Sequence, residues 1–218
     1  MRTIAFVTHK GGSGKSTIAS SLAVVAREMK EKVAVVDMDP QGSLISWLRS
    51  RGSADIQVVA SNGARLPAVL ARLEAGDCTL AIIDTPGAEG PASSSAIVTA
   101  DLSIVPSRPS VFDLWASAKT CDAIKSAGKE FVFLLNQCPP AQETARVRDG
   151  VETLEEMGSL LSPLVLARQV YQEAARRGLG VTELDPGSDA AEEMRDLWIS
   201  IRRRLAMAKP RTLARTAA

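Results

Sequence analysis

A glycine-rich loop lies between an apolar run and an amphipathic stretch near the start of the chain. Residues His9 to Thr17 read HKGGSGKST and follow the apolar run Ile4 to Val7. The glycines let backbone N–H groups turn inward around an anion, because no Cβ blocks the approach. Lys15 is placed to reach phosphate oxygens and the Ser16 hydroxyl to bind Mg²⁺, at the positive end of the helix that starts there. The order of strand, loop and helix therefore predicts a polyphosphate site in an α/β fold, and disfavours a loop that only connects two elements.

The loop departs from the ordinary Walker A pattern in two ways. The pattern G-x-x-x-x-G-K-[ST] requires glycine where this chain has His9, and a second lysine, Lys10, precedes the glycine pair. This variant resembles the deviant Walker A loop of the ParA/MinD ATPase family, and in particular its small plasmid-type, ParF-like members. The resemblance implies that Lys10 reaches across a dimer to the phosphates bound by the partner subunit, so that Lys10 and Lys15 are both catalytic. It also assigns nucleotide contacts to the whole loop, namely Gly11, Gly12, Ser13, Gly14, Lys15, Ser16 and Thr17.

A second motif ends the apolar run Val33 to Asp37. A second carboxylate, Asp39, follows two residues later, and a proline then forces the chain to turn. The string V-D-x-D-P-Q-G resembles switch I of ParA-like proteins. The resemblance implies that Asp39 is a catalytic residue that orients the attacking water, and that Asp37 supports the Mg²⁺ shell. For Asp37 taken alone, the alternative is an aspartate that caps a helix or a loop.

A third motif, Leu80 to Gly87, reads LAIIDTPG. It has the form of a Walker B strand that ends in Asp84, which would hold Mg²⁺ through water because Mg²⁺ keeps much of its hydration shell. The D-x-x-G spacing resembles switch II and brings the Gly87 N–H close to a γ-phosphate. The expected metal site thus consists of Ser16, Asp37 and Asp84.

The choice of base follows from an absent motif. P-loop GTPases read guanine with N/T-K-x-D after a later strand, whereas here the sequence is Asn136-Gln137-Cys138-Pro139, without the lysine or the aspartate. ATP with Mg²⁺ is therefore the expected nucleotide. Family resemblance implies that Asn136 contacts adenine, and an asparagine that caps the end of a strand is the alternative.

Apolar runs of strand length alternate with longer amphipathic segments. Strands are expected over 3–8, 33–37, 56–60, 80–84, 102–105 and 131–135, with a further short strand over 164–166. Helices are expected over 15–30, 41–51, 64–74, 91–100, 111–127, 142–157, 169–177 and 190–208. This alternation predicts a doubly wound, mainly parallel α/β sheet with helices on both faces, of the P-loop NTPase type. Asp37, Asp39 and Asp84 fall at the carboxyl ends of strands, where such sheets bind ligands.

Length, charge and composition exclude several classes of protein. A chain of 218 residues is expected to form one domain over 1–208, followed by a flexible basic tail over 209–218. The net charge of +1 creates no global field that dictates a partner. Three widely spaced cysteines and a single histidine form neither a disulfide framework nor a multi-histidine metal site, and they fit a reducing cytosol. We expect no signal peptide and no membrane span, and hence a cytoplasmic protein.

Basic residues gather near the end of the chain. After Asp196 no acidic residue occurs, whereas Arg202, Arg203 and Arg204 are consecutive. A solvated helix face is the plain interpretation of such a run. In the ParA family, however, the ATP-bound dimer binds DNA without sequence preference through basic residues that include the C-terminal region, so the resemblance implies salt-sensitive DNA binding here. Arg168, in the plasmid-type segment R-Q-V-Y, is a further DNA-binding candidate or else the partner of a carboxylate.

A proline-rich stretch, Pro106 to Asp113, follows the strand expected over 102–105. In small ParA-like proteins a similar stretch lies beside the nucleotide and the dimer interface. Asp113 is also explained as a carboxylate that interacts with the dipole of the next helix.

The resemblance implies a ParA-like ATPase with slow intrinsic hydrolysis. It would form an ATP-dependent sandwich dimer, bind nucleoid DNA, and be stimulated by a ParB-like protein or cargo adaptor while it segregates or positions a plasmid, chromosome or protein complex. The alternative is a MinD-like ATPase on a membrane surface, although the tail beyond residue 209 has only Leu213 as a sizeable apolar residue. A metal-cluster reductase would need cysteines that bridge a dimer, and neither Cys121 nor Cys138 has the expected setting. A module that binds ATP without turnover would tolerate substitutions of Asp39.

Overall fold

Six strands form one parallel sheet in the computed structural model, which describes residues 1–140 and 144–208. In space the strands follow the order β3-β2-β4-β1-β5-β6, so the predicted doubly wound parallel sheet is confirmed. The expected start of a helix at Gln142 and the expected tail over 209–218 lie outside the described residues. The strand bounds are β1 (Arg2–Phe6), β2 (Val33–Asp37), β3 (Gln57–Ala60), β4 (Leu80–Asp84), β5 (Leu102–Ser107) and β6 (Phe131–Leu135).

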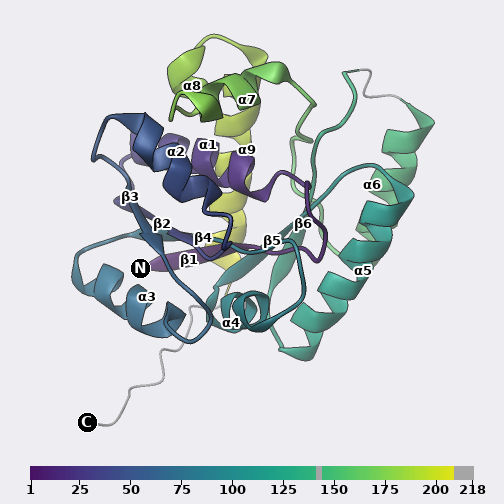
Figure 1. Cartoon of the computed structure of the whole chain (residues 1–218). Helices are drawn as coiled ribbons and strands as arrows, with labels where there is room; N and C mark the ends of the chain where they lie inside the picture. Colours follow the sequence, from purple (N-terminus) through teal and green to yellow (C-terminus); the bar gives the residue numbers. More distant parts are fainter. Residues whose placement is uncertain (141–143, 209–218) are drawn as a thin grey trace.

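Helices cover both faces of the sheet (Figure 1). On one face, α1 (Lys15–Glu28), α2 (Ser43–Arg51), α7 (Gln169–Arg176), α8 (Val181–Leu184) and α9 (Asp189–Met207) contribute to one apolar cluster. On the other face, α3 (Leu66–Ala75), α4 (Pro91–Thr99), α5 (Val111–Ser126) and α6 (Ala145–Met157) contribute to a second cluster. Buried strands between two helical layers explain why their sequences are apolar throughout rather than alternating.

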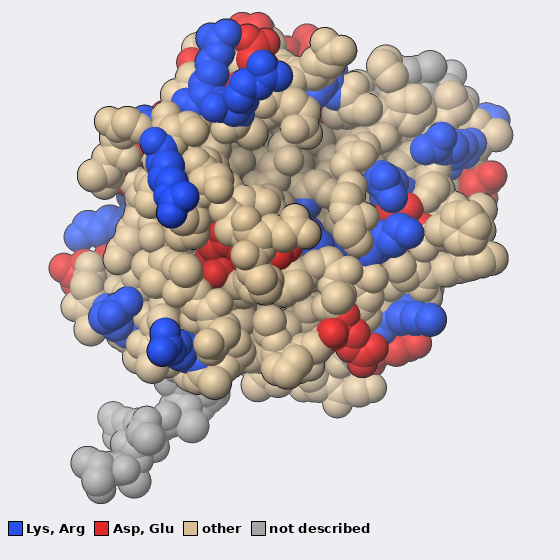
Figure 2. Space-filling view, viewed as in Figure 1, with Lys and Arg blue, Asp and Glu red and all other residues tan. Residues whose placement is uncertain are grey.

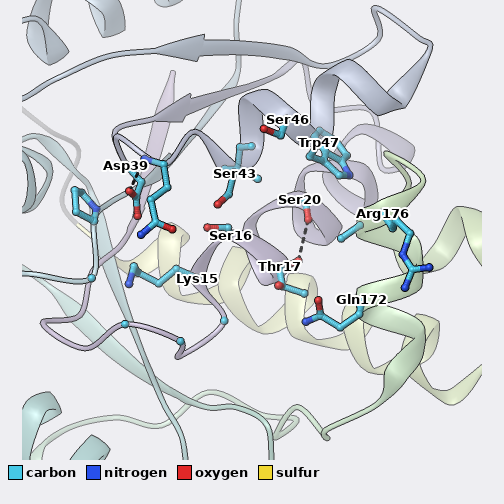
Figure 3. A pocket seen from close by; sticks show the side chains of 18 of the residues that line it. Lys15, Ser16, Thr17, Ser20, Asp39, Ser43, Ser46, Trp47, Gln172 and Arg176 are labelled. Carbon is cyan, nitrogen blue, oxygen red and sulfur yellow. Dashed lines mark hydrogen bonds between the residues drawn. The ribbon is translucent and has the colours of Figure 1, made fainter.

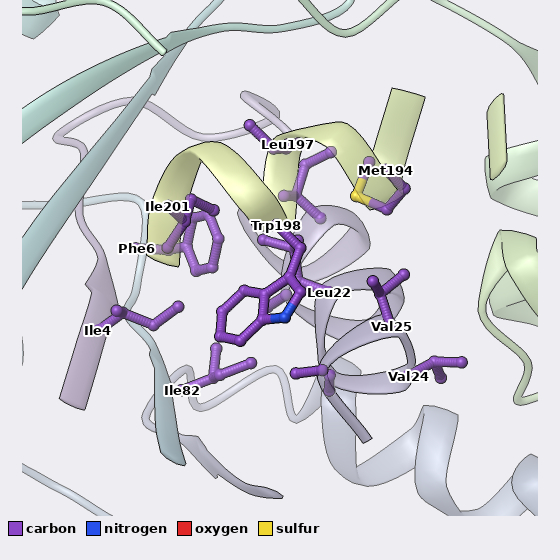
Figure 4. Close-up of a cluster of buried hydrophobic side chains, with 14 of the residues drawn as sticks. Ile4, Phe6, Leu22, Val24, Val25, Ile82, Met194, Leu197, Trp198 and Ile201 are labelled. Carbon is purple, nitrogen blue, oxygen red and sulfur yellow. The ribbon is translucent and has the colours of Figure 1, made fainter. Parts of the chain in front are cut away.

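Strand β1 shows how the two clusters share the sheet. Ile4 and Phe6 belong to the first cluster, whereas Ala5 belongs to the second, because successive side chains point to opposite faces of a strand. Trp198 of α9 is 1% exposed and lies between the sheet and α1, near Ile4 and Leu22 (Figure 4). The apolar stripe of the last long helix is therefore part of the core, as its helical spacing predicts.

The strand expected over 164–166 is wrong. The segment after α6 instead follows the outer edge of β6, where Leu160 and Leu166 form isolated bridges to Phe133 and Cys138. Pro163, in the middle of this segment, has no N–H to donate to a ladder. The segment thus covers the edge of β6 without extending the sheet.

Two helical details differ from the sequence predictions. Helix α2 begins at Ser43 rather than Gln41, because Gly42 precedes it in a left-handed conformation with φ 64°. The four-residue helix α8 was not expected, since a single turn carries too little periodicity to stand out. Across the described ranges, no helix combines the length and the apolar character that a membrane crossing would require.

Candidate functional site

The register of the sheet brings the three sequence motifs together. Asp84 at the end of β4 pairs with Phe6 of β1 on one side and with Asp37 of β2 on the other. The glycine-rich loop follows the carboxyl end of β1, which lies next to β4 in the sheet. Motifs with residues up to 78 positions apart in sequence therefore meet at one edge of a parallel sheet, where α/β proteins bind ligands.

Two glycines of the loop need the conformational freedom that only glycine has. Gly12 and Gly14 have φ of 76° and 88°, in the left-handed region. A Cβ on Gly14 would also lie 2.4 Å from Asn136 Nδ2. Gly87 from the switch II motif approaches the same loop, since a Cβ there would lie 2.8 Å from the Cα of Gly11. Glycine is needed at these positions because the backbone adopts left-handed conformations and other atoms approach it too closely to leave room for a Cβ, as in loops that bind phosphate.

Lys15 projects back across the loop rather than into solvent. The residue is 7% exposed, and its Nζ donates a hydrogen bond to the Lys10 carbonyl oxygen at 3.4 Å. Burial lowers the pKa of Lys15, while the nearby carboxylates of Asp84 and Asp39 act in the opposite direction. Lys10 itself is half-buried at the start of the loop. A positive charge held inside the loop is what a bound polyphosphate would need.

The surroundings of Asp84 suit the binding of a cation. It is fully buried, its Oδ2 accepts a hydrogen bond from Ser16 Oγ at 2.6 Å, and its Oδ1 has no hydrogen-bond partner among the described residues. Burial raises the pKa of Asp84 to about 7. An unpartnered carboxylate oxygen inside a protein is costly, and a hard divalent cation with oxygen ligands relieves that cost. The donor chemistry of Ser16 and Asp84 therefore fits Mg²⁺, and their role as a metal site stays a prediction.

Asp37 and Asp39 have different surroundings. Asp37 Oδ2 accepts hydrogen bonds from the backbone N–H groups of Leu44 and Ile45 at 3.0 and 3.1 Å, at the start of α2, and its Oδ1 accepts from the Asp39 N–H at 3.1 Å. Asp37 therefore caps a helix, which is the alternative that the sequence left open, and its part in the Mg²⁺ shell stays a prediction. Asp39 is partly exposed and lines the pocket, with Oδ1 accepting from the Gln41 N–H at 2.9 Å.

The loop opens into a pocket of about 880 Å³ (Figure 3). Lys15 and Asp39 lie at one end of the pocket, and Thr17 leads to a second region that the sequence did not reveal. There α2 contributes Trp47, and α7 contributes Gln172 and Arg176. No motif marks these residues; only the packing of α7 against α1 and α2 brings them to the pocket.

Asn136 and Gln137 hold the glycine-rich loop in place through side-chain hydrogen bonds to its carbonyl groups. Asn136 Nδ2 donates to the Ser13 carbonyl oxygen at 2.7 Å, and Asn136 Oδ1 accepts from the Gln137 N–H at 2.8 Å. Gln137 Nε2 donates to the Gly12 carbonyl oxygen at 3.0 Å. The side chain of Asn136 is thus engaged with the phosphate loop, and its contact with adenine stays a prediction. The bracing role of Gln137 was not anticipated.

The candidate DNA-binding residues do not form one cluster within the chain. Arg168 pairs with Asp189 at 3.3 Å near the start of α9, whereas Arg202, Arg203 and Arg204 lie in its last turns. Arg202 follows Asp189 by 13 positions along the helix, which corresponds to about 20 Å. Basic and acidic side chains are interspersed on the face shown in Figure 2, so that face presents no continuous basic surface.

The fold, the loop and the carboxylates together define a nucleotide-binding P-loop protein. The chain belongs to the CobQ/CobB/MinD/ParA nucleotide-binding family, whose model matches residues 4–181. It is thus a ParA/MinD-family ATPase, and the predicted family is confirmed.

Two curated relatives match most of the chain. The "Maintenance of carboxysome distribution protein A" of Halothiobacillus neapolitanus is 30% identical over 206 residues, which cover 89% of this chain and 94% of the relative. The protein of the same name from Gloeobacter kilaueensis is 33% identical over 186 residues, or 84% of each chain.

Solved structures show the same fold. Apo McdA from Cyanothece superposes with a TM-score of 0.79 at 19% identity, covering 94% of this chain and 99% of that one. The septum site-determining protein MinD of Pyrococcus horikoshii, complexed with Mg-ADP, has a TM-score of 0.74 at 21% identity, with 94% and 98% covered.

Proposed function

We propose that this chain is a ParA-like ATPase that pairs into a sandwich dimer around Mg·ATP, binds DNA without sequence preference, and hydrolyses ATP slowly to position a cargo. The observation that carries the proposal is the pair formed by buried Asp84 and half-buried Ser16 beside Lys15, in which one carboxylate oxygen has no partner among the described residues. A metal bound to triphosphate satisfies both the carboxylate and the buried ammonium group.

In this proposal each residue of the site has a separate role in phosphoryl transfer. Lys15 neutralises charge on the β- and γ-phosphates, and the N–H groups around Gly12 and Gly14 hold the phosphate oxygens. Mg²⁺, when bound, neutralises the charge that develops on the phosphate oxygens. Asp39, at the pocket surface, orients the attacking water, and Lys10 of a second subunit supplies a further positive charge.

We further propose that the cargo is a protein assembly rather than a plasmid. This rests on the two relatives that match most of the chain, since both are named for carboxysome distribution. By contrast, the Protein ParA of Rhizobium radiobacter is 28% identical over 126 residues, or 57% of this chain. A cargo adaptor would then stimulate hydrolysis in place of a ParB-like protein, and the protein would be cytoplasmic and associated with the nucleoid.

Paired lysine substitutions test the division of roles. Lys15→Ala is expected to abolish ATP binding, because the only ammonium group held inside the described loop is lost. Lys10→Ala is expected to keep ATP binding and to lose ATP-dependent dimerisation. Isothermal titration measures the first property and light scattering with ATPγS the second. A Lys10→Ala protein that dimerises like the wild type would refute the role in trans.

DNA binding needs its own assay. We expect gel retardation of random-sequence DNA with ATPγS to weaken steeply between 50 and 200 mM salt, because phosphate contacts release counterions. The triple substitution of Arg202, Arg203 and Arg204 to alanine is expected to reduce the salt slope. Liposome co-sedimentation in the same buffers tests the MinD-like alternative, and vesicle binding without DNA retardation would favour that alternative.

A further inference from the structure

Arg51 fixes the C-terminal end of α2 with a full set of hydrogen bonds. Its side chain is 2% exposed, and it donates five hydrogen bonds, as many as a guanidinium group has N–H donors. Two go to Asp55 at 2.8 and 2.9 Å, two to Glu183 at 2.8 and 2.7 Å, and one to the Gly178 carbonyl oxygen at 2.9 Å. Buried contacts of this geometry hold a helix end far more firmly than a surface ion pair does.

The backbone of the turn between α7 and α8 packs directly against the same end of α2. Gly178, in this turn, has φ of 70°, and a Cβ on it would lie 2.2 Å from the Arg51 backbone nitrogen. One turn earlier on α2, the indole Nε1 of Trp47 donates to the Leu179 carbonyl oxygen at 3.2 Å. The C-terminal half of α2 is therefore anchored to the α7–α8 turn through both backbone and side chains.

The N-terminal end of α2 follows the loop that carries Asp39. Asp37 accepts hydrogen bonds from the first turn of the helix, and Gly42, the residue before the helix, donates its N–H to the Asp39 carbonyl oxygen at 2.9 Å. Asp39 is thus joined to α2 through a single short turn. A helix of nine residues is too short to be stable by itself, so the contacts at its two ends set its position.

We propose that Arg51 is a positioning residue for hydrolysis, which holds α2 so that Asp39 keeps the attacking water in line. The inference rests on the proposed function, in which Asp39 orients that water. Arg51 lies about 12 Å along the helix from Ser43, so it acts through α2 and not by contact with the phosphates. When this end of α2 is released, the helix can pivot about the Asp37 cap and shift Asp39. A misplacement of about 1 Å in a reacting group is enough to slow a reaction on the order of a hundredfold.

Steady-state ATP hydrolysis by the intact protein tests this role. Arg51→Met should lower kcat at least tenfold and leave KM and the Kd for Mg·ATPγS within about twofold, because the phosphate loop is unchanged. Arg51→Lys keeps the charge and some of the hydrogen bonds, so it should recover part of kcat. Gly178→Ala should also lower kcat at unchanged Kd, because its Cβ displaces the end of α2 without removing a charge.

Two controls separate positioning from a general loss of stability. Leu154→Ala truncates a buried leucine of α6 in the cluster on the opposite face of the sheet. It should lower Tm and leave kcat unchanged once the rate is normalised to the protein that binds Mg·ATPγS. Arg49→Met removes an exposed arginine of α2 and should change neither Tm nor kcat.

A double-mutant cycle shows whether Arg51 acts through Asp39. If it does, Arg51→Met should add no further loss to the rate of Asp39→Ala, measured in single turnover and normalised to the protein that binds Mg·ATPγS. Additive losses in the cycle, or an unchanged kcat in Arg51→Met, would overturn this inference alone. A wild-type protein that does not hydrolyse ATP, or an Asp39→Ala protein with the wild-type rate, would overturn both this inference and the proposed function.

Discussion

Replacing Asp84 with asparagine separates the energetic cost of burying its carboxylate from the function of that carboxylate. Asparagine has the same shape and can still exchange a hydrogen bond with the Ser16 hydroxyl, which lies 2.6 Å from Asp84 Oδ2. It carries no charge, however, so the cost of burying an ionised carboxylate disappears. We expect Asp84→Asn to stabilise the ligand-free protein while it loses the response to Mg²⁺.

The stabilisation expected from Asp84→Asn depends on pH. Burial raises the pKa of Asp84 from 3.8 to about 7, so the folded state retains a proton that the unfolded state has lost. Stability therefore falls as pH rises through this window, and the full penalty is present above pH 7. At about 1.4 kcal/mol per pKa unit the penalty is on the order of 4 kcal/mol. For a chain of this size, removing this penalty by Asp84→Asn should raise Tm on the order of 10 °C at pH 8. At pH 5 the rise in Tm should be about a third as large.

Thermal unfolding with EDTA and without nucleotide, at pH 5, 6, 7 and 8, measures the difference in Tm. The matched control is Asp113→Asn, because Asp113 is also buried but is paired with the Arg108 guanidinium. That substitution breaks an ion pair and should lower Tm. With Mg·ADP present, the wild type should gain more Tm than Asp84→Asn does. A Tm difference for Asp84→Asn that is negative, or that does not grow with pH, would refute the reasoning.

Two further predictions concern close packing and buried charge. Gly87→Ala places a Cβ 2.8 Å from the Cα of Gly11, so it should weaken nucleotide affinity at least tenfold, as measured by titration calorimetry. The control is Gly90→Ala, which has open space around the new Cβ and should bind nucleotide as the wild type does. Arg51→Met removes the buried guanidinium that Asp55 and Glu183 share with Arg27, so it should lower the free energy of unfolding by about 2–4 kcal/mol, measured by urea denaturation. Arg49→Met, on the exposed side of the same helix, should change the free energy of unfolding by less than about 0.5 kcal/mol. Equal losses for Arg51→Met and Arg49→Met would contradict the second prediction.

Local sequence chemistry was enough to predict the phosphate loop. The positive φ of Gly12 and Gly14 and the burial of Lys15 follow from a glycine-rich turn between a strand and a helix. The strand limits Val33–Asp37 and Leu80–Asp84 were also predicted residue for residue, because both runs are apolar and end in a carboxylate. Such features depend on neighbours in the chain, which a sequence displays directly.

Long-range contacts decided the rest. That Asn136 holds the Ser13 carbonyl, that Asp37 caps α2, and that the strand expected over 164–166 only covers the edge of β6 depend on residues distant in sequence. The exposure of Phe112 and Trp115 is of the same kind, since the sequence of α5 does not say which of its faces another element covers. The sequence by itself therefore determined the fold class and the chemistry of the loop. The tertiary structure decided which polar groups are already satisfied, which carboxylate oxygen is not, and which apolar side chains remain exposed, because each depends on what packs against it in three dimensions.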